Sequence, residues 1–229
     1  SLYLPEGVTA PEYEGKSVTL LDLATHYSAL PTFCCTNLCE EYTMDQLYSF
    51  LSGYQMTRAP GSTYEYSNYG FGLLGNLLVR RASQADYEAL LLERITHPLG
   101  MDSTRIQLTP DMLSRLATPH SSYSVATSLW DNPTLAGAGA IQSTANDMLT
   151  FLAANMGLTG TELQPALRLA STPQRPTEVS ACMVGLGWHF PSWTIMIGDS
   201  RFLVPGKGIH EHNGGTGGYR SYLAWDPQR

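Results

Sequence analysis

The sequence has 229 residues, of which 43% are hydrophobic and 14% are charged, a composition typical of a globular protein with one large domain or two small ones. Its net charge of −7 disfavours nucleic acid or an anionic membrane as a partner, because an acidic surface repels both. No apolar run reaches the length that spans a bilayer. The chain opens on Ser1 without a signal-peptide pattern, so its start does not indicate a compartment.

Residues 1–170 are predicted to be mostly helical. At four places a Thr or Ser is followed, three residues later, by a side chain that can reach back, the pattern of a helix N-terminus. These pairs are Thr19 with Asp22, Thr43 with Gln46, Ser83 with Asp86, and Thr144 with Asp147. Thr109-Pro110 predicts another helix start. Proline has no backbone N–H, but in the first turn of a helix this group would have no partner within the helix, so its absence costs nothing. Gly53 and Gly157 are predicted to end two helices in the left-handed conformation.

Three cysteines, Cys34, Cys35 and Cys39, fall in one short polar segment, and Cys182 stands far from them. The C-x-x-C spacing of a zinc site is missing and no histidine follows closely. A disulfide from Cys39 to Cys34 or Cys35, or free thiols in a loop, is favoured over a metal site.

The character of the chain changes in residues 171–229. Four short segments rich in aromatic and β-branched residues are separated by Gly, Pro, Asp or Ser, which predicts an antiparallel meander. They are GLGWHF (185–190), WTIMIGD (193–199), GIHEHNG (208–214) and RSYLAWD (220–226). A helical part followed by a sheet indicates a single α+β domain over residues 1–229, with a cleft expected where the two parts meet.

The stretch YEYSNYGFGLLG, residues 64–75, places a tyrosine, a serine and an asparagine directly before a Gly- and Leu-rich run. Ser67 or Asn68 can cap a helix that begins near Tyr69 by accepting hydrogen bonds from its first N–H groups. The alternative is a catalytic loop in which Tyr66 and Asn68 point into a cleft. The stretch alone favours capping.

A second candidate segment is HEHNGGTGGY, residues 210–219. A strand that ends in HNGG (212–215) lets a ligand approach the backbone, because glycine has no side chain in the way. The N–H of Gly215 can then serve as half of an oxyanion hole. Two alternatives stay open: a metal pair of His210 and His212 in a metal-dependent hydrolase, for which no third ligand is visible nearby, and a glycine-rich hairpin without function.

Together these segments resemble the serine β-lactamases and penicillin-binding proteins. YSN at 66–68 and HNG at 212–214 are similar to the second and third motifs of that superfamily, in the class C-type branch of D,D-carboxypeptidases, D,D-endopeptidases and β-lactamase-like esterases. The resemblance covers nearly the whole chain and implies a β-lactamase/transpeptidase-like α+β fold, truncated at both ends. The segments that carry it, in the family's order, are TLLDLATHYSALP (19–31), APGSTYEYSNYGFGLLG (59–75), HPLGMDST (97–104), GAGAIQSTANDMLTFL (137–152) and GLGWHF (185–190).

The resemblance implies acyl transfer, in which a serine attacks a carbonyl carbon and water then hydrolyses the acyl-enzyme. Tyr66 would act as the base or proton shuttle, which at neutral pH requires nearby positive charge because an ordinary tyrosine has a pKa of about 10. Asn68 would bind the substrate amide, and Gly215 would donate its N–H to the oxyanion. Ser67 would cap the helix that follows.

The resemblance also implies roles along the glycine-rich strand. His212 stands where many relatives carry lysine, and would supply part-time positive charge or a donor to a substrate carboxylate. Asn213, Gly214 and Thr216 would contact the substrate. No metal and no cofactor is implied.

The chain departs from the family because it lacks the S-x-x-K of the nucleophilic serine. Its two lysines are Lys16 and Lys207, and Tyr13 and Val204 stand three residues before them. Without the helix of that motif, the helical part and the sheet lose a packing element and the sheet has open edges. The chain is expected to be a fragment of a split enzyme, a minimal form that dimerises or exchanges strands, or a remnant that cannot acylate.

The implied function is therefore a hydrolase of β-lactam, ester or D-Ala-D-Ala-like acyl substrates, whose activity is weak or depends on a missing segment. The alternative is a non-catalytic module that binds a β-lactam or a peptidoglycan peptide. The expected partners are that small molecule or peptide, and either a second copy of the chain or a complementing N-terminal segment. By resemblance alone, the expected compartment is the periplasm or the cell envelope.

Overall fold

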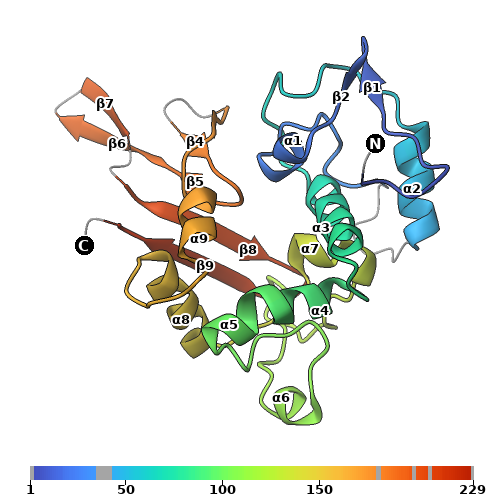
Figure 1. Cartoon of the computed structure of the whole chain (residues 1–229). Coiled ribbons are helices and arrows are strands. Elements are labelled where there is room, and N and C mark those ends of the chain that lie inside the picture. The colour runs from blue at the N-terminus through green and yellow to red at the C-terminus, as the bar shows by residue number, and fades with distance from the viewer. Residues whose placement is uncertain (1–2, 35–42, 179–181, 198–199, 206–207, 228–229) are drawn as a thin grey trace.

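The computed structural model describes residues 3–34, 43–178, 182–197, 200–205 and 208–227. For residues 192–197 and 200–205 it describes the backbone alone. A helical part lies beside a C-terminal antiparallel sheet (Figure 1), so the predicted α+β class is confirmed. The helices are α1 Leu20–Ala24, α2 Met44–Gly53, α3 Asn68–Ala82, α4 Tyr87–Leu91, η1 Leu92–Thr96, α5 His97–Leu99, α6 Pro110–Ser114, η2 Pro133–Leu135, α7 Ala136–Gly139, α8 Ala145–Asn155 and α9 Gln164–Ala170. The strands are β1 Glu12–Tyr13, β2 Lys16–Ser17, β3 Arg175–Pro176, β4 Met183–Val184, β5 His189–Phe190, β6 Ser192–Ile197, β7 Ser200–Pro205, β8 His210–Gly215 and β9 Arg220–Trp225.

Helices begin where a local side chain caps the first N–H groups. Thr19 and Thr43 each accept a hydrogen bond from the N–H three residues later, and the side chain at that position accepts one in return from the cap's own N–H. Thr144 caps α8, because its hydroxyl oxygen accepts a hydrogen bond from the N–H of Asp147 at 3.2 Å. Pro110 is the first residue of α6. The predicted starts of these helices are confirmed, because capping depends on neighbours in sequence.

Two predicted boundaries are wrong. Ser83 does not start a helix, because α3 runs on to Ala82 and Ser83 ends it with a φ of 55°. Asp86 is the residue that caps the next helix, α4. Gly53 is the last residue of α2 and has no positive φ, since the chain leaves this helix in an extended conformation. Gly157, after α8, has the expected positive φ of 74°.

The main sheet has the strand order β3-β4-β5-β8-β9 and is antiparallel throughout. The predicted antiparallel pairing is confirmed, but the strand order of a meander is wrong, because β6 and β7 form a separate hairpin that projects from the sheet (Figure 1). These two strands are neighbours in sequence, and a short connection favours their pairing with each other. The predicted disulfide involves Cys35 and Cys39, which lie outside the described residues.

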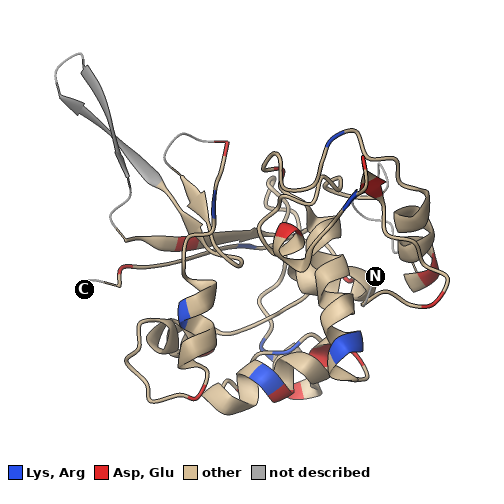
Figure 2. Cartoon of the chain, turned by 45° about the horizontal axis from the view of Figure 1, so that its top comes forward, with Lys and Arg blue, Asp and Glu red and all other residues tan. Residues whose placement is uncertain are grey.

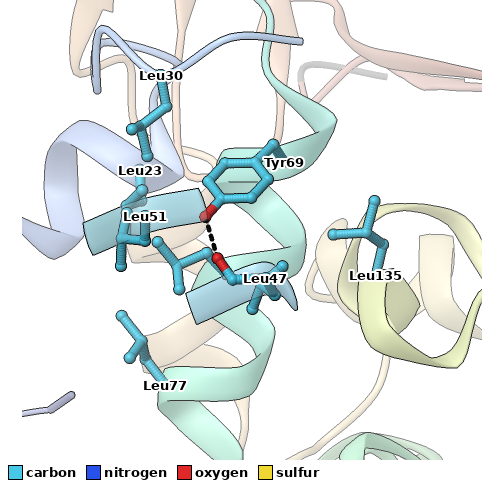
Figure 3. Packing of buried hydrophobic residues seen from close by; sticks show 8 residues of the cluster. Leu23, Leu30, Leu47, Leu51, Tyr69, Leu77 and Leu135 are labelled. Carbon is cyan, nitrogen blue, oxygen red and sulfur yellow. Dashed lines mark hydrogen bonds between the residues drawn. The ribbon is translucent and has the colours of Figure 1, made fainter. Parts of the chain in front are cut away.

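The helical part is built around Tyr69, which is 0% exposed and comes from α3. Its hydroxyl donates a hydrogen bond to the carbonyl of Leu47 in α2 at 2.9 Å, and leucines of α1, α2 and α3 surround its ring (Figure 3). Gly72 lets the segment η2 approach α3, because a Cβ at this position would lie 2.1 Å from Leu135. The buried members of this first core are Leu23, Leu30, Leu47, Leu51, Tyr69, Leu73, Leu77 and Leu135.

A second core lies between the sheet and the helices α8 and α9. Trp188, Phe190 and Trp225 are buried there, and residues of α8 and α9 pack against them. Among the described residues, the two cores have no member in common. The two packed units are therefore the helices of the first core and the sheet with α8 and α9, and polar contacts join them.

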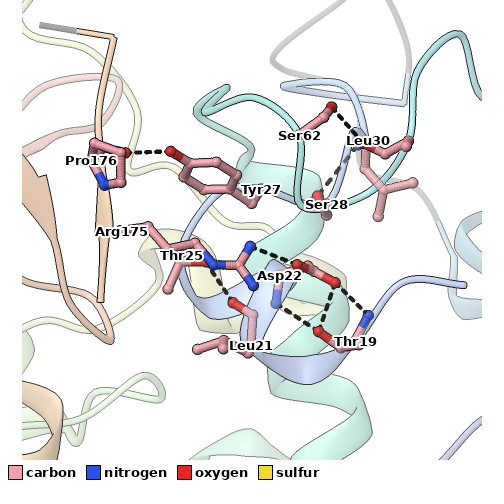
Figure 4. A network of polar contacts seen from close by, with 11 residues as sticks. Thr19, Leu21, Asp22, Thr25, Tyr27, Ser28, Leu30, Ser62, Arg175 and Pro176 are labelled. Atoms are coloured by element: carbon pink, nitrogen blue, oxygen red, sulfur yellow. Dashed lines mark hydrogen bonds and ion pairs between the residues drawn. The ribbon is translucent and has the colours of Figure 1, made fainter. Parts of the chain in front are cut away.

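One such contact is the ion pair of Asp22 in α1 with Arg175 in β3, at 2.6 Å (Figure 4). The Asp22 side chain is 4% exposed, and its second oxygen accepts hydrogen bonds from the N–H and hydroxyl of Thr19. Arg175 also lies over the ring of Tyr27, whose hydroxyl donates to the carbonyl of Pro176 at 2.5 Å. We call these four residues, Asp22, Arg175, Tyr27 and Pro176, the clamp.

Charged residues are spread over the helical part and are sparse on the main sheet (Figure 2). None of the helices formed by the described residues has the length and apolar character needed to cross a membrane. Neither feature adds a partner to those expected from the sequence.

Candidate active site

Three histidines and two tyrosines gather where the helical part meets the sheet. The imidazole of His26, which follows α1, lies between the rings of Tyr66 and Phe71, with centroid separations of 4.3 Å and 4.6 Å. The ring of His189, in β5, lies parallel to it at 6.4 Å. His26 is therefore flanked by the predicted catalytic tyrosine on the helical side and by a histidine of the sheet.

His189 joins the two sides of this cluster. The hydroxyl of Tyr64 and the Nε2 atom of His189 are hydrogen-bonded at 3.1 Å. The ring of His189 also stacks on that of His212 in β8, at 5.1 Å. Tyr66 and His212 are thus linked through His26 and His189. We refer to His26, Tyr64, Tyr66, Phe71, His189 and His212 as the ring cluster.

The YSN stretch has the capping role that its sequence suggests, at Ser67. Ser67 is buried and is the N-cap of α3, accepting from the N–H of Gly70 at 2.8 Å and donating its hydroxyl to the carbonyl of Pro31. Tyr66, on one side of it, is 39% exposed. Asn68, on the other side, is half-buried, and its side chain makes no hydrogen bond to any described residue. The cap at Ser67 thus fixes the backbone, while the side chains of Tyr66 and Asn68 on either side of it stay available to a ligand.

The environment of Tyr66 does not by itself prepare a base. Burial raises the pKa of Tyr66, which is the opposite of what proton abstraction at neutral pH requires. A nearby cation would lower this pKa by favouring the phenolate. The role predicted for Tyr66 therefore depends on positive charge that the ring cluster does not provide.

The strand β8 presents a free edge beside the ring cluster. It pairs with β9 over all its residues, from His210 to Gly215, but with β5 only at Glu211. From His212 onward, no described strand pairs with the β5 side of this strand. A Cβ at Gly214 would lie 2.4 Å from the Ser221 hydroxyl oxygen, so this position is closely packed across the β8–β9 pair.

The remaining predicted site residues follow this edge. Asn213 and Gly215 are exposed, while Gly214 and Thr216 are half-buried. Backbone N–H groups at a free strand edge can stabilise an oxyanion without any movement of the chain. The structure therefore links Tyr66 to His212 through the rings of His26 and His189, and the other predicted residues of the second motif follow His212 along the chain.

The environment of the three histidines in the ring cluster favours their neutral form, because the pKa of each is lowered. Burial, together with the nearby His189 and His212, lowers the pKa of His26 to about 3. Burial also lowers the pKa of His189, helped by the adjacent imidazole of His212. Burial lowers the pKa of His212 as well, against the opposing effects of the Asn213 backbone and Glu211. Of the two roles predicted for His212, this favours that of a hydrogen-bond donor over that of a charge.

A titration followed by NMR of the histidine ring signals will test this. His26 is expected to stay uncharged down to about pH 4, while His189 and His212 titrate below their ordinary value of 6.5. Because the unfolded chain binds these protons and the native chain does not, the free energy of unfolding should fall as the pH falls below 6.5, and His26 alone should contribute a slope approaching about 1.4 kcal/mol per pH unit down towards pH 3. A native His26 signal that titrates near 6.5, as it should in urea, would contradict this assignment.

His210 has a different environment from His212, although both lie on β8. Its ring contacts Phe190 and Trp225 of the second core, at 4.7 Å and 4.1 Å. It lines a cavity of about 330 Å³ between α8, α9 and the strands β8 and β9. The metal pair of His210 and His212 is not supported, because in the described part of the chain no three His, Cys, Asp or Glu side chains are placed to hold a metal ion.

Sequence reasoning missed His26, Tyr64 and His189. His26 and Tyr64 stand in segments 19–31 and 59–75, and His189 stands in GLGWHF. All three positions were thus inside segments that resemble the family. The presence of a histidine in such a segment was a signal that could have found them. The partners of these residues are distant in sequence, however, since Tyr64 and His189 are 125 positions apart.

Comparison with known proteins identifies the family of the chain. The model of the β-lactamase family matches residues 1–229. The D-alanyl-D-alanine-carboxypeptidase/endopeptidase AmpH of Escherichia coli K12 is 32% identical over 250 residues, which cover 100% of this chain and 60% of that protein. A β-lactamase of Yersinia enterocolitica is 29% identical, over 96% of this chain and 62% of its own.

Solved structures show the same fold. A β-lactamase/D-alanine carboxypeptidase of Yersinia pestis superposes with a TM-score of 0.77 at 27% identity, over 99% of this chain and 66% of that one. A structure with the same description from Pseudomonas syringae, at 19% identity, has a TM-score of 0.80. The chain spans about three fifths of the length of the curated relatives that it matches, 60% and 62%. The chain belongs to the β-lactamase family.

Proposed function

We propose that this chain forms the proton-transfer and oxyanion side of a serine-hydrolase site that takes β-lactam, ester or D-Ala-D-Ala-like acyl compounds. The observation that supports it is the series of ring contacts that runs from Tyr66 through His26 and His189 to His212 of β8. Tyr66 handles the proton, Asn68 binds the amide, and the N–H of Gly215 stabilises the oxyanion. His212 donates a hydrogen bond to the substrate.

The acylation step requires a Ser-x-x-Lys pair, which the 229 residues do not contain. The lysine would also supply the positive charge that Tyr66 lacks, since a neighbouring cation lowers a tyrosine pKa. Full activity of this chain therefore depends on a complementing N-terminal segment. The periplasm or cell envelope is the compartment in which we propose that this activity operates.

A binding experiment tests the substrate class without requiring turnover. A fluorescent penicillin should bind the purified chain and be displaced by unlabelled penicillin and by a D-Ala-D-Ala peptide. Asn68→Ala should weaken binding by about tenfold, the loss of one well-placed hydrogen bond, whereas Leu158→Ala, at a residue 72% exposed, should not. Binding that no unlabelled competitor displaces, or no binding at all, would overturn the proposal.

Replacement of Tyr66 tests the proton-transfer role. Hydrolysis of a p-nitrophenyl ester above background is expected from the purified chain, because oxyanion stabilisation and positioning retain some catalysis without the nucleophile. Tyr66→Phe should lower this rate by on the order of 10²-fold, the usual contribution of a proton-transfer group. Tyr123→Phe, at a tyrosine 88% exposed, is the matched control. Equal rates in Tyr66→Phe and the native chain would refute the role.

A second candidate function is a non-catalytic module that binds a β-lactam or a peptidoglycan peptide. It is favoured by the neutral histidines and the raised pKa of Tyr66, neither of which activates a nucleophile. Displaceable binding without any ester hydrolysis would identify this function. A covalent penicillin adduct, located by mass spectrometry, would instead identify an attacking residue within the chain.

A further inference from the structure

His26 occupies a position from which it can control Tyr66. It is 2% exposed, it follows α1, and it has a φ of 59°. Residues 26–32 lie along residues 61–69 and hydrogen-bond to them repeatedly. These bonds run from Gly61 N–H to Tyr27 O, Glu65 N–H to His26 O, Thr32 hydroxyl to Tyr66 O, and Tyr69 N–H to Thr32 O.

The imidazole of His26 adds a contact that the backbone cannot supply. Its Nδ1 atom accepts a hydrogen bond from the N–H of Ser67 at 3.1 Å. Because Nδ1 accepts, the neutral ring carries its proton on Nε2. One face of the ring lies against Tyr66 at 4.3 Å, with an interplanar angle of 31°. His26 thus holds both the backbone beside Tyr66 and the phenol ring itself.

We infer that His26 is a positioning residue for Tyr66, fixing the phenol beside the β8 edge through the Ser67 N–H bond and the contact between the two rings. Phe71 supports the imidazole from the other side, at 4.6 Å. The role rests on the proposed function of Tyr66, but its structural part can be measured independently. It requires the Nε2–H tautomer, because only an unprotonated Nδ1 accepts the Ser67 bond.

The tautomer is tested first, in the native chain. A ¹⁵N spectrum of the histidine rings near pH 7 should show an unprotonated Nδ1 and a protonated Nε2 for His26. It should also show contacts between the ring protons of His26 and Tyr66. A protonated Nδ1, or the absence of those contacts, would overturn the inference whatever the activity of the chain.

Two substitutions then separate the parts of the role. His26→Asn keeps an acceptor near the position of Nδ1 but removes the ring, whereas His26→Phe keeps a ring but removes the acceptor. In each folded variant, the ¹³C signal of the Tyr66 ring should move, and its pKa should fall towards the ordinary value of about 10 as the ring becomes more exposed. His97→Asn, at an exposed histidine, should leave the Tyr66 signal in place.

The kinetic readout distinguishes positioning from general stability. Ester hydrolysis should fall by on the order of tenfold to a hundredfold in either His26 variant, because small misplacements of a reacting group are costly. The Kd of fluorescent penicillin should change less than about threefold, since ground-state binding does not need an exact phenol position. Variants that are less stable but keep the native Tyr66 signal and rate would show that His26 is merely structural. If the native chain neither binds nor hydrolyses, the proposed function fails while the Tyr66 signal still reports on His26.

Discussion

Tyr69→Ala is expected to lower the free energy of unfolding by about 4 kcal/mol, the usual cost of removing a large buried aromatic side chain. Tyr69 is 0% exposed and lies at the centre of the first core, between α2 and α3. Its loss would leave a cavity that the surrounding leucines cannot fill without moving α2 (Figure 3). Chemical unfolding at pH 7, followed by far-UV circular dichroism, measures the change.

Tyr69→Phe is the matched control for this prediction. It keeps the ring and removes only the hydroxyl that donates to Leu47 at 2.9 Å, so a loss of about 1 kcal/mol is expected. A Tyr69→Ala variant as stable as Tyr69→Phe would show that the first core is not packed as described.

Arg175→Ala should lower the free energy of unfolding by about 2–3 kcal/mol, because it leaves the carboxylate of Asp22 buried without its partner. The value lies below that of a fully buried pair, since Arg175 is 23% exposed and solvent screens it in part. Arg115→Ala removes a similar pair with Asp111 on the surface and should cost at most about 0.5 kcal/mol. Equal effects of the two substitutions would show that the clamp does not join the helical part to the sheet.

The pH dependence of the clamp gives an independent check. Burial alone would raise the pKa of Asp22, but hydrogen bonds from Thr19 and Arg175, with the charge of Arg175, lower it below 3.8. A carboxyl whose native pKa is depressed stabilises the fold above its unfolded pKa, and this contribution disappears as the pH falls through the native pKa. The stability difference between the native chain and Asp22→Asn should therefore be full above pH 3.8 and shrink below it.

Much of the helical part was predictable because its boundaries depend on neighbours in sequence. Thr19, Thr43 and Thr144 cap helices through bonds that span three residues, which a sequence displays directly. The sheet was less predictable, because pairing depends on contacts between distant segments. The aromatic and β-branched composition of residues 193–199 indicated a strand, but nothing in it indicated that this strand would leave the main sheet for a separate hairpin.

The candidate site shows the same division. The motifs pointed to Tyr66, Asn68 and the β8 edge, and the fold links Tyr66 to His212 of β8 through two further histidines. His26 and His189 were missed, because their importance depends on the rings that pack against them in the folded chain. The direction of their pKa shifts could not be predicted either, because these shifts are caused by burial, and burial depends on the tertiary structure.

The division of the apolar interior into two cores has a consequence for how the molecule loses its structure. Cooperative unfolding requires that the loss of one unit destabilise the other, and the contacts that contribute to this coupling include the clamp and the bond between Tyr64 and His189. Amide hydrogens of α3 and those of β8 and β9 are therefore expected to exchange with solvent in separate steps. The ring cluster, where we propose that a substrate binds, lies among the contacts that join these two units.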